Sequence, residues 1–246
     1  MNKQIVTKVT VTGADDSVRH VDLVKIQRLY PYAEFGILMS ERYSTGSGAG
    51  RFPSKAWLID LVKCATHNKL NLSGHICGQW VKDAYAGEWP DLGAVDADLR
   101  QIFQRFQLNT HAQKHQLYAD DMSVLLADLE ARNQTVIFQL DGGDGTAAAR
   151  EMVTTHKNVA GLFDLSHGAG ILPDEWPSPI PGLATGYAGG LSPGNVVEQM
   201  DAILVAADGQ DIWIDAETHL RSPDDLTFDL EKVVAFLEKA APYVKG

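Results

Sequence analysis

Ionisable and amide side chains recur along this 246-residue sequence, each close behind a short apolar run. Their types suit acid–base chemistry, because a carboxylic acid can give a proton to a substrate oxygen while a carboxylate or an imidazole removes one from carbon. The candidates for proton transfer are Asp164, Glu217, His75 and Cys77. The candidates for binding a substrate are Arg51, Arg42, Asn109, Asp215, Gly189 and Gly190.

The most informative segment is the turn Ala188-Gly189-Gly190-Leu191-Ser192-Pro193. Glycines let backbone N–H groups approach an anion, and the helix predicted to follow adds the partial positive charge of its N-terminus. An ordinary tight turn in which Ser192 caps that helix and Pro193 occupies its first turn fits the same residues. The residues alone leave both interpretations open.

The apolar runs predict the elements that must position these side chains. Eight runs have the length and composition of strands: Ile5–Thr12, Ala33–Met39, Leu70–Cys77, Phe103–Leu108, Thr135–Leu140, Val159–Phe163, Gly182–Tyr187 and Asp211–Ala216. Several are apolar on both faces, which is typical of strands covered by helices outside a barrel and packed within it. Helical patterns lie between them, at Asp16–Leu29, Pro53–Thr66, Asp120–Arg132, Thr146–His156, Pro193–Ala206 and Asp229–Tyr243.

Eight strands alternating with helices over this length predict one (β/α)8 TIM barrel domain spanning residues 1–246. The alternation is weakest in the segments 79–101 and 165–180, and three prolines in the second disfavour a full helix there. In such barrels the site lies at the C-terminal ends of the strands. Those ends carry the candidate residues.

Composition limits the class of partner. The formal net charge is −11, which argues against a nucleic-acid or anionic-membrane partner, and no run is long enough to span a membrane. Two cysteines are too few for a disulfide framework, and the N-terminal residues do not have the pattern of a signal peptide. We therefore expect a cytoplasmic protein that acts on a small molecule. The oligomeric state is not predicted.

The segment Ala188-Gly189-Gly190-Leu191-Ser192-Pro193-Gly194-Asn195-Val196 resembles the AGGLxPxNV motif of phosphoribosylanthranilate isomerases. Other segments follow in that family's order. Val11-Thr12-Gly13 takes the place of its ICG, Arg51-Phe52-Pro53-Ser54 is similar to its RxVS-type loop, and Gln107-Leu108-Asn109 is similar to its QLH. Leu162-Phe163-Asp164 is similar to its LLD, and Ile214-Asp215-Ala216 to the start of its VDVSSGVE.

The resemblance implies a TIM barrel that isomerises a small sugar phosphate or polyol. Asp164 would be the general acid, the amides of Gly189 and Gly190 would hold an anion, and Arg51 or Arg42 would contact the substrate. Thr12 stands where the family has its basic cysteine, and a threonine hydroxyl is too weak a base without an activating partner. Cys77 could reach the same cavity, or it could be a small buried side chain.

The eighth strand departs further from the family. Glu217-Thr218-His219 replaces small residues, and a carboxylate beside a phosphate is repulsive. Three outcomes stay open: Glu217 points away, His219 or Arg221 compensates its charge, or the ligand is not a phosphate. The glycine-rich loop 40–52 could be a lid or only a surface loop.

Two other functions fit the same barrel. One is an aldolase, lyase or epimerase that uses Asp164, His75 and Glu217, with or without a metal ion; the other is a barrel that binds a metabolite without catalysis. Five side chains could converge on a divalent ion, namely His75, His111, Asp141, Asp164 and His167. None of them has a diagnostic local spacing, so we predict neither a metal nor an organic cofactor.

Overall fold

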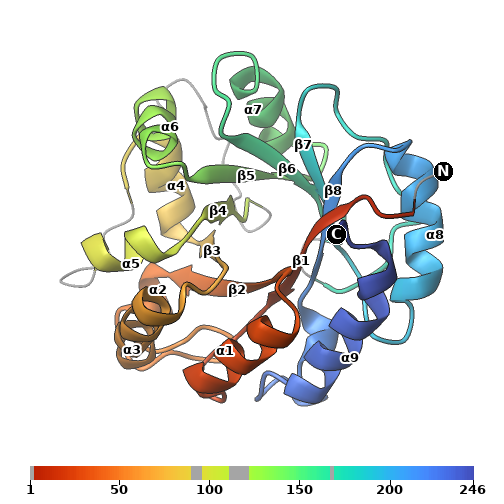
Figure 1. Cartoon of the computed structure of the whole chain (residues 1–246). Coiled ribbons are helices and arrows are strands. Elements are labelled where there is room, and N and C mark those ends of the chain that lie inside the picture. The colour runs from red at the N-terminus through yellow and green to blue at the C-terminus, as the bar shows by residue number, and fades with distance from the viewer. Residues whose placement is uncertain (1–2, 90–95, 111–121, 167–168) are drawn as a thin grey trace.

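A computed structural model shows eight parallel strands that pair in chain order and close into one barrel (Figure 1). It describes residues 3–89, 96–110, 122–166 and 169–246. The strands are β1 Val6–Thr12, β2 Ala33–Ser40, β3 Leu72–Cys77, β4 Arg105–Leu108, β5 Thr135–Leu140, β6 Val159–Phe163, β7 Ala184–Tyr187 and β8 Ile212–Ala216. Every predicted strand is present, and the (β/α)8 fold class is confirmed.

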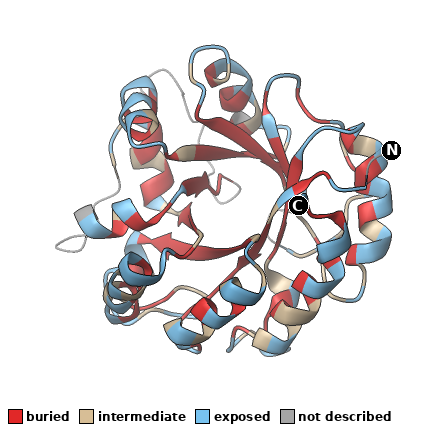
Figure 2. Ribbon diagram, viewed as in Figure 1, coloured by how far each residue is buried: buried red, intermediate tan, exposed pale blue. Residues whose placement is uncertain are grey.

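Helices surround the barrel and bury their apolar faces against it (Figure 2). They are α1 His20–Leu29, α2 Glu41–Ser44, α3 Lys55–Asn68, α4 Gln79–Tyr85, α5 Asp96–Ile102, α6 Met122–Ala131, α7 Asp144–Met152, α8 Val196–Ala207 and α9 Leu230–Ala240, with short 3-10 turns at Thr218–Leu220 and Ala241–Tyr243. The described residues between β6 and β7 form no helix, as the prolines predicted. None of the described helices is long and apolar enough to cross a lipid bilayer.

The predicted start of α8 is wrong. The helix begins at Val196, with Asn195 rather than Ser192 at its N-cap position. The Asn195 side chain folds back over the turn, accepting a hydrogen bond from the Ser192 N–H at 2.8 Å and donating one to the Gly190 carbonyl at 2.9 Å. Residues 192–194 therefore form a separate turn before the helix.

The interior of the barrel is divided into two halves. Strands β5, β6 and β8 contribute a small apolar cluster of Ile137, Ala160, Leu162 and Trp213. Gly186 of β7 pairs with Trp213, and a Cβ at position 186 would lie 2.1 Å from the indole, so this strand needs a glycine there. Strands β1 to β4 instead bring buried polar side chains inward: Thr10, Glu34, His75 and Gln107.

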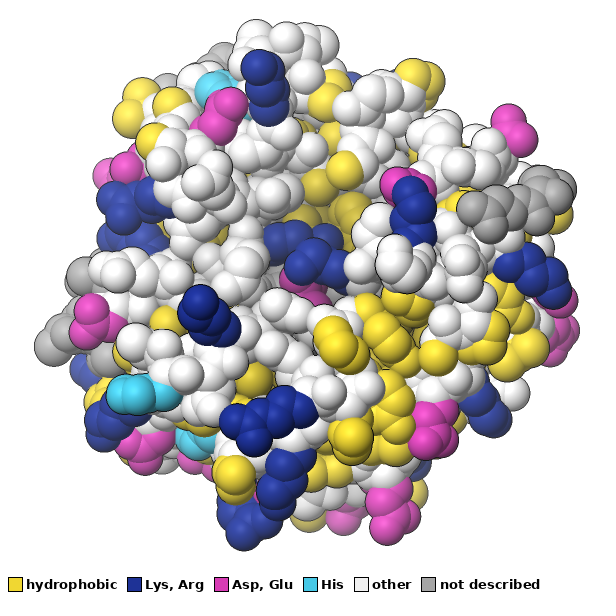
Figure 3. Space-filling view, viewed as in Figure 1, with side chains coloured by type: hydrophobic (Ala, Val, Ile, Leu, Met, Phe, Trp, Pro, Cys, Tyr) yellow, Lys and Arg dark blue, Asp and Glu magenta, His cyan; other side chains and the backbone are white. Residues whose placement is uncertain are grey.

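A buried ion pair joins the strands of the polar half. The Arg105 guanidinium donates to both oxygens of Glu34, with Nε at 3.1 and 3.0 Å, and also to the Thr10 hydroxyl. It lies over the Trp213 ring, 4.6 Å from the ring centroid, where the two halves meet. Basic side chains with an acidic one beside them are visible in the hollow at the centre of the face drawn in Figure 3.

Candidate active site

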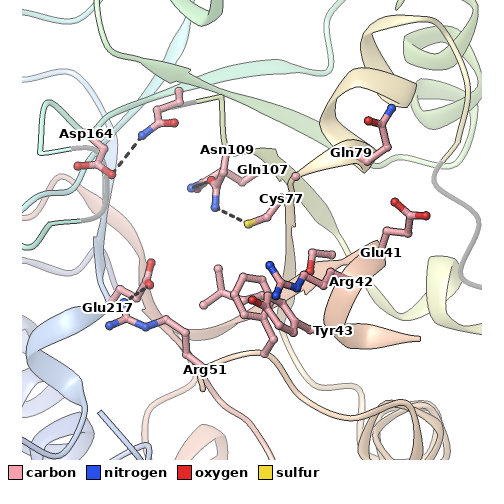
Figure 4. A pocket seen from close by; sticks show the side chains of 15 residues that line it. Glu41, Arg42, Tyr43, Arg51, Cys77, Gln79, Gln107, Asn109, Asp164 and Glu217 are labelled. Atoms are coloured by element: carbon pink, nitrogen blue, oxygen red, sulfur yellow. Dashed lines mark hydrogen bonds and ion pairs between the residues drawn. The ribbon is translucent and has the colours of Figure 1, made fainter. Parts of the chain in front are cut away.

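A cavity of about 580 Å³ opens at the C-terminal ends of β2 to β6 and β8. Figure 4 shows Asp164 and Glu217 on one side of it, the amides of Gln107 and Asn109 in the middle, and Arg42 and Tyr43 on the opposite side. Two carboxyl groups, several amides and a cation therefore face one space. This arrangement can bind a polar molecule and exchange protons with it.

Asp164 follows β6, and its carboxylate is held in a fixed orientation. Oδ1 accepts hydrogen bonds from the Ser166 backbone N–H at 3.2 Å and the Ser166 hydroxyl at 2.7 Å. Oδ2 accepts one from the Gln139 amide of β5 at 3.3 Å. These donors direct the carboxyl group towards the cavity that it lines.

Glu217 follows β8 and is paired with the loop after β2. One nitrogen of Arg51 donates to Glu217 Oε1 at 2.5 Å, and the other donates to Asp225 at 2.9 Å. The first also donates to the Thr218 hydroxyl at 3.2 Å. Arg51 thus fastens the glycine-containing loop before α3 to the segment between β8 and α9.

Of the three outcomes left open for Glu217, compensation of its charge by His219 or Arg221 is not observed, because Glu217 pairs with Arg51. Arg221 is 1% exposed and donates to Asp15, Asp225 and the Gly13 carbonyl, so it is enclosed in its own network. His219 contacts the Gly170 carbonyl at 2.9 Å. The Arg42 side chain can still bind a ligand, since it is exposed and has no ion-pair partner within the described part of the chain. Its Cζ atom lies 5.2 Å from the centroid of the Tyr43 ring.

A chain of hydrogen bonds crosses the middle of the cavity from β4 to β3. The Gln107 amide donates to Asn109 Oδ1 at 2.8 Å, and the Asn109 amide donates to Cys77 Sγ at 3.2 Å. Burial raises the pKa of the Cys77 thiol to about 12, against the opposing effect of the Asn109 hydrogen bond. Cys77 therefore lines the cavity as a protonated thiol rather than as a base.

A second, much smaller cavity of about 30 Å³ lies between the ends of β6, β7 and β8. It has room for about one or two groups the size of a water molecule. Asp164 and Glu217 line this cavity too, together with Asp215, Gly189 and Gly190. Within the described residues the N–H groups of Gly189 and Gly190 have no hydrogen-bond acceptor.

Asp215 of β8 is buried beside this small cavity. The Thr12 hydroxyl of β1 donates to its Oδ1 at 2.8 Å, and its Oδ2 lies 4.0 Å from Nε2 of His75. Burial raises the pKa of Asp215 well above its usual range, and the negative charges of Glu217 and Glu34 add to that effect. Burial lowers the pKa of His75 to about 3, so its imidazole is uncharged near neutral pH.

The structure brings nine of the ten predicted site residues to these two cavities. Asp164, Glu217, Cys77, Arg42, Arg51 and Asn109 line the larger one, while Asp215, Gly189 and Gly190 line the smaller. His75 lines neither, because it lies two residues before Cys77 on β3 and so sits one layer deeper in the barrel. Its two ring nitrogens are buried without a hydrogen-bond partner among the described residues.

The residues that line the larger cavity but were not predicted for the site include Tyr43, Gln79, Gln107 and Gln139. Gln107 lies two residues before Asn109 on β4, so the alternation of a strand places both side chains on the inner face. The same alternation along β5 could have predicted that Gln139 faces inward. Nothing in the sequence indicated Gln79, which opens the short helix α4.

Metal binding receives no support from the described residues, among which no three His, Cys, Asp or Glu side chains could hold a metal ion. Two of the five predicted ligands, His111 and His167, lie outside the described residues. Asp141 turns back to accept a hydrogen bond from the Gly143 N–H at 2.8 Å.

Comparisons with known proteins support the fold alone. No protein-family model matches this sequence, and no curated protein matches it. A truncated 3-deoxy-D-arabino-heptulosonate 7-phosphate synthase from Thermotoga maritima is 12% identical, with 98% of this chain and 89% of that chain covered and a TM-score of 0.52. ZgEngAGH5_4, solved in complex with a cellotriose, is 9% identical, with 95% and 96% covered and a TM-score of 0.50. At these identities the likeness supports the TIM-barrel fold and says nothing of the function.

Proposed function

We propose that this protein is an acid–base isomerase, similar to phosphoribosylanthranilate isomerase, that acts on a small sugar phosphate or polyol. One observation carries the proposal: the carboxyl groups of Asp164 and Glu217 line the same two cavities. Isomerisation of a sugar needs one group that protonates an oxygen and another that takes a proton from the neighbouring carbon. Two carboxyl groups facing one substrate can divide those tasks.

The wall of the larger cavity supports a polyhydroxylated substrate. The amides of Gln79, Gln107, Asn109 and Gln139 offer donors and acceptors, which match several hydroxyl groups. Arg42 supports an anionic group at the other side, because its guanidinium can donate two parallel hydrogen bonds to a phosphate or a carboxylate. The cavity at Gly189 and Gly190 is small, which favours a single oxygen there and leaves Arg42 as the stronger candidate for a phosphate.

The reaction then follows from these positions. Asp164 gives its proton to the ring oxygen of the sugar and takes up the proton of the anomeric hydroxyl, as the ring opens to the aldehyde. Glu217, as the carboxylate paired with Arg51, removes the proton from the carbon next to the carbonyl group. Glu217 returns that proton to C1, while Asp164 gives its proton to O1 and takes up the proton of the C2 hydroxyl. The aldose has then become a ketose, and each carboxyl group has regained its starting state.

The test uses deuterium exchange, since removal of a carbon-bound proton admits deuterium from the solvent. The protein is incubated in D2O with D-ribose 5-phosphate, D-glucose 6-phosphate, D-ribose and D-glucose, and the C2 proton is followed by NMR. We expect exchange and ketose formation with at least one compound. Exchange with a C2 epimer as product would instead indicate the epimerase alternative, and tight binding without exchange would indicate a metabolite-binding barrel.

Replacing Asp164 by Asn tests the general acid. We expect D164N to lower turnover by about 10²–10⁴-fold, because the amide cannot give up a proton, while the circular dichroism spectrum stays unchanged. The matched control is D141N, since Asp141 follows the neighbouring strand β5 but lines neither cavity. Unchanged turnover in D164N would eliminate the acid role.

A further inference from the structure

The small cavity gathers hydrogen-bond donors beside two carboxyl groups. We propose that Asp215 is a further catalytic residue, a neutral carboxylic acid that donates a hydrogen bond to the substrate oxygen on which negative charge develops. This role deepens the proposed isomerisation and rests on it. The donor faces a space of about 30 Å³, which has room for about one or two water-sized groups. The N–H groups of Gly189 and Gly190, which have no acceptor among the described residues, face the same space.

The chemistry requires such a donor. When Glu217 removes the carbon-bound proton, the electron pair moves to the carbonyl oxygen and forms an enediolate. Asp164 and Glu217 line the same small cavity, so an oxyanion there would face negative charge. A donor without charge can stabilise the oxyanion, whereas an ionised Asp215 would repel it. Asp215 transfers no proton in this step, because the proton that it shares in the hydrogen bond stays on its carboxyl group.

The surroundings of Asp215 hold it in the acid form. Its side chain is buried, and the titratable or charged groups around it come from six segments. They are Glu217 just after its own strand, Glu34 on β2, His75 on β3 and Arg105 on β4, with Asp164 and His219 at the wall of the small cavity. The positive charge of Arg105 acts against the raised pKa of Asp215. Burial is the largest cause of its raised pKa, and the two glutamates act in the same direction. His75 is neutral and therefore supplies no charge that would favour the carboxylate.

Thr12 is a positioning residue for Asp215. Its hydroxyl donates to Oδ1, so Oδ1 acts as the acceptor and Oδ2 is left to carry the proton. Oδ2 lies 4.0 Å from His75 Nε2, which is too long for a hydrogen bond, so the proton is not engaged by the imidazole. In this interpretation the threonine at the end of β1 needs no basic strength, because its task is to orient a carboxylic acid.

The first measurement needs no substrate. The protein is labelled with [γ-¹³C]aspartate and titrated by NMR, with D215N used to assign the resonance of Asp215. We expect this carboxyl group to stay protonated above pH 7. A midpoint near pH 4 would overturn the inference.

The second measurement is the pH dependence of C2 exchange, with whichever of the four sugars above exchanges fastest. We expect the wild-type rate to fall on the alkaline side as Asp215 ionises. Asn cannot ionise but still offers N–H donors, so D215N should lose less than about tenfold near pH 7 and show no such alkaline fall. D215A removes the donor and should lose about 10²–10³-fold. A merely structural role for Asp215 would not abolish the alkaline fall.

Thr12 variants give a matched series. The Thr12 hydrogen bond favours the carboxylate form of Asp215, so T12V should move the alkaline fall upward by about one pH unit, and T12S should restore it. An alkaline fall that persists in D215N overturns the Asp215 role and leaves the isomerase intact. Absence of exchange by the wild type with all four sugars overturns the proposed function and this role together.

Discussion

Burial lowers the pKa of His75 and raises that of Asp215, and the two side chains therefore affect stability in opposite directions with pH. His75 has a folded pKa of about 3 against 6.5 when unfolded, so its contribution is complete above pH 6.5 and is lost as the pH falls towards 3. Asp215 has a folded pKa raised above 3.8, so its contribution is complete below that value and is lost as the pH rises. Above about pH 4, and up to the folded pKa of Asp215, the two slopes have opposite signs.

In D215N, the free energy of unfolding should change with pH with the slope that His75 alone produces. Between pH 6 and pH 4 we expect the free energy of unfolding of D215N to fall more steeply than that of the wild type, by up to about 1.4 kcal/mol per pH unit. Urea denaturation at several pH values measures this difference. D141N, which changes an aspartate outside both cavities, should follow the wild type. Parallel curves for D215N and the wild type would show that Asp215 is ionised in the folded protein.

At the scale of elements, one side chain connects the loop before α3 to the segment between β8 and α9. Arg51 makes hydrogen bonds to Glu217, Thr218 and Asp225, all beyond β8. The loop also contains Gly48 and Gly50 with positive φ angles of 73° and 56°. Backbone hydrogen bonds within the loop, such as the pair between Ala49 and Phe52, shape it locally, while Arg51 ties it to a distant segment.

R51M should release this loop. We expect thermolysin to cut within residues 45–52 several times faster in R51M than in the wild type, because three hydrogen bonds to the β8–α9 segment are lost. R42M is the matched control, since Arg42 is exposed and has no ion pair among the described residues. Equal cleavage of the two variants would argue against the anchoring role. Mass spectrometry of the fragments locates the cut.

Elements were predictable to different degrees, for physical reasons. The strands β5 and β6 were predicted with their observed ends, because both faces of a barrel strand are buried and produce a mostly apolar run. Helix α4 was missed because it has only seven residues and buries Trp80, Val81, Ala84 and Tyr85, which gives no clear amphipathic period. The α8 start was misplaced because the side chain of Asn195, a local competitor of Ser192, closes the turn.

At the scale of the whole molecule, the sequence was enough to predict which residues line the site, but not which of them contact one another. Barrel topology places the end of every strand at one mouth, which is enough to collect Asp164, Glu217 and Asn109. The partner of Glu217 is Arg51, 166 residues away, and no local pattern specifies that contact. The depth of His75 likewise depends on strand register, which a single residue shift would reverse.

The buried Glu34–Arg105 pair joins β2 and β4 within the polar half of the barrel. E34Q leaves the Arg105 charge without its partner, so we expect a loss of about 3–5 kcal/mol in the free energy of unfolding. The double variant E34L/R105M removes both charges and should lose less than E34Q. Urea denaturation decides between these outcomes, and D128N, which breaks an exposed pair with Arg132, should cost no more than about 1 kcal/mol. A double variant with a lower free energy of unfolding than E34Q would show that the pair itself stabilises the barrel.

The protonated state of Cys77 has a consequence for handling and for chemical stress. Peroxides and alkylating reagents attack the thiolate, and a thiol whose pKa is about 12 supplies almost none of it at neutral pH. The mouth of this barrel should therefore tolerate air, iodoacetamide and dilute hydrogen peroxide, although a sulfur atom lies in its wall.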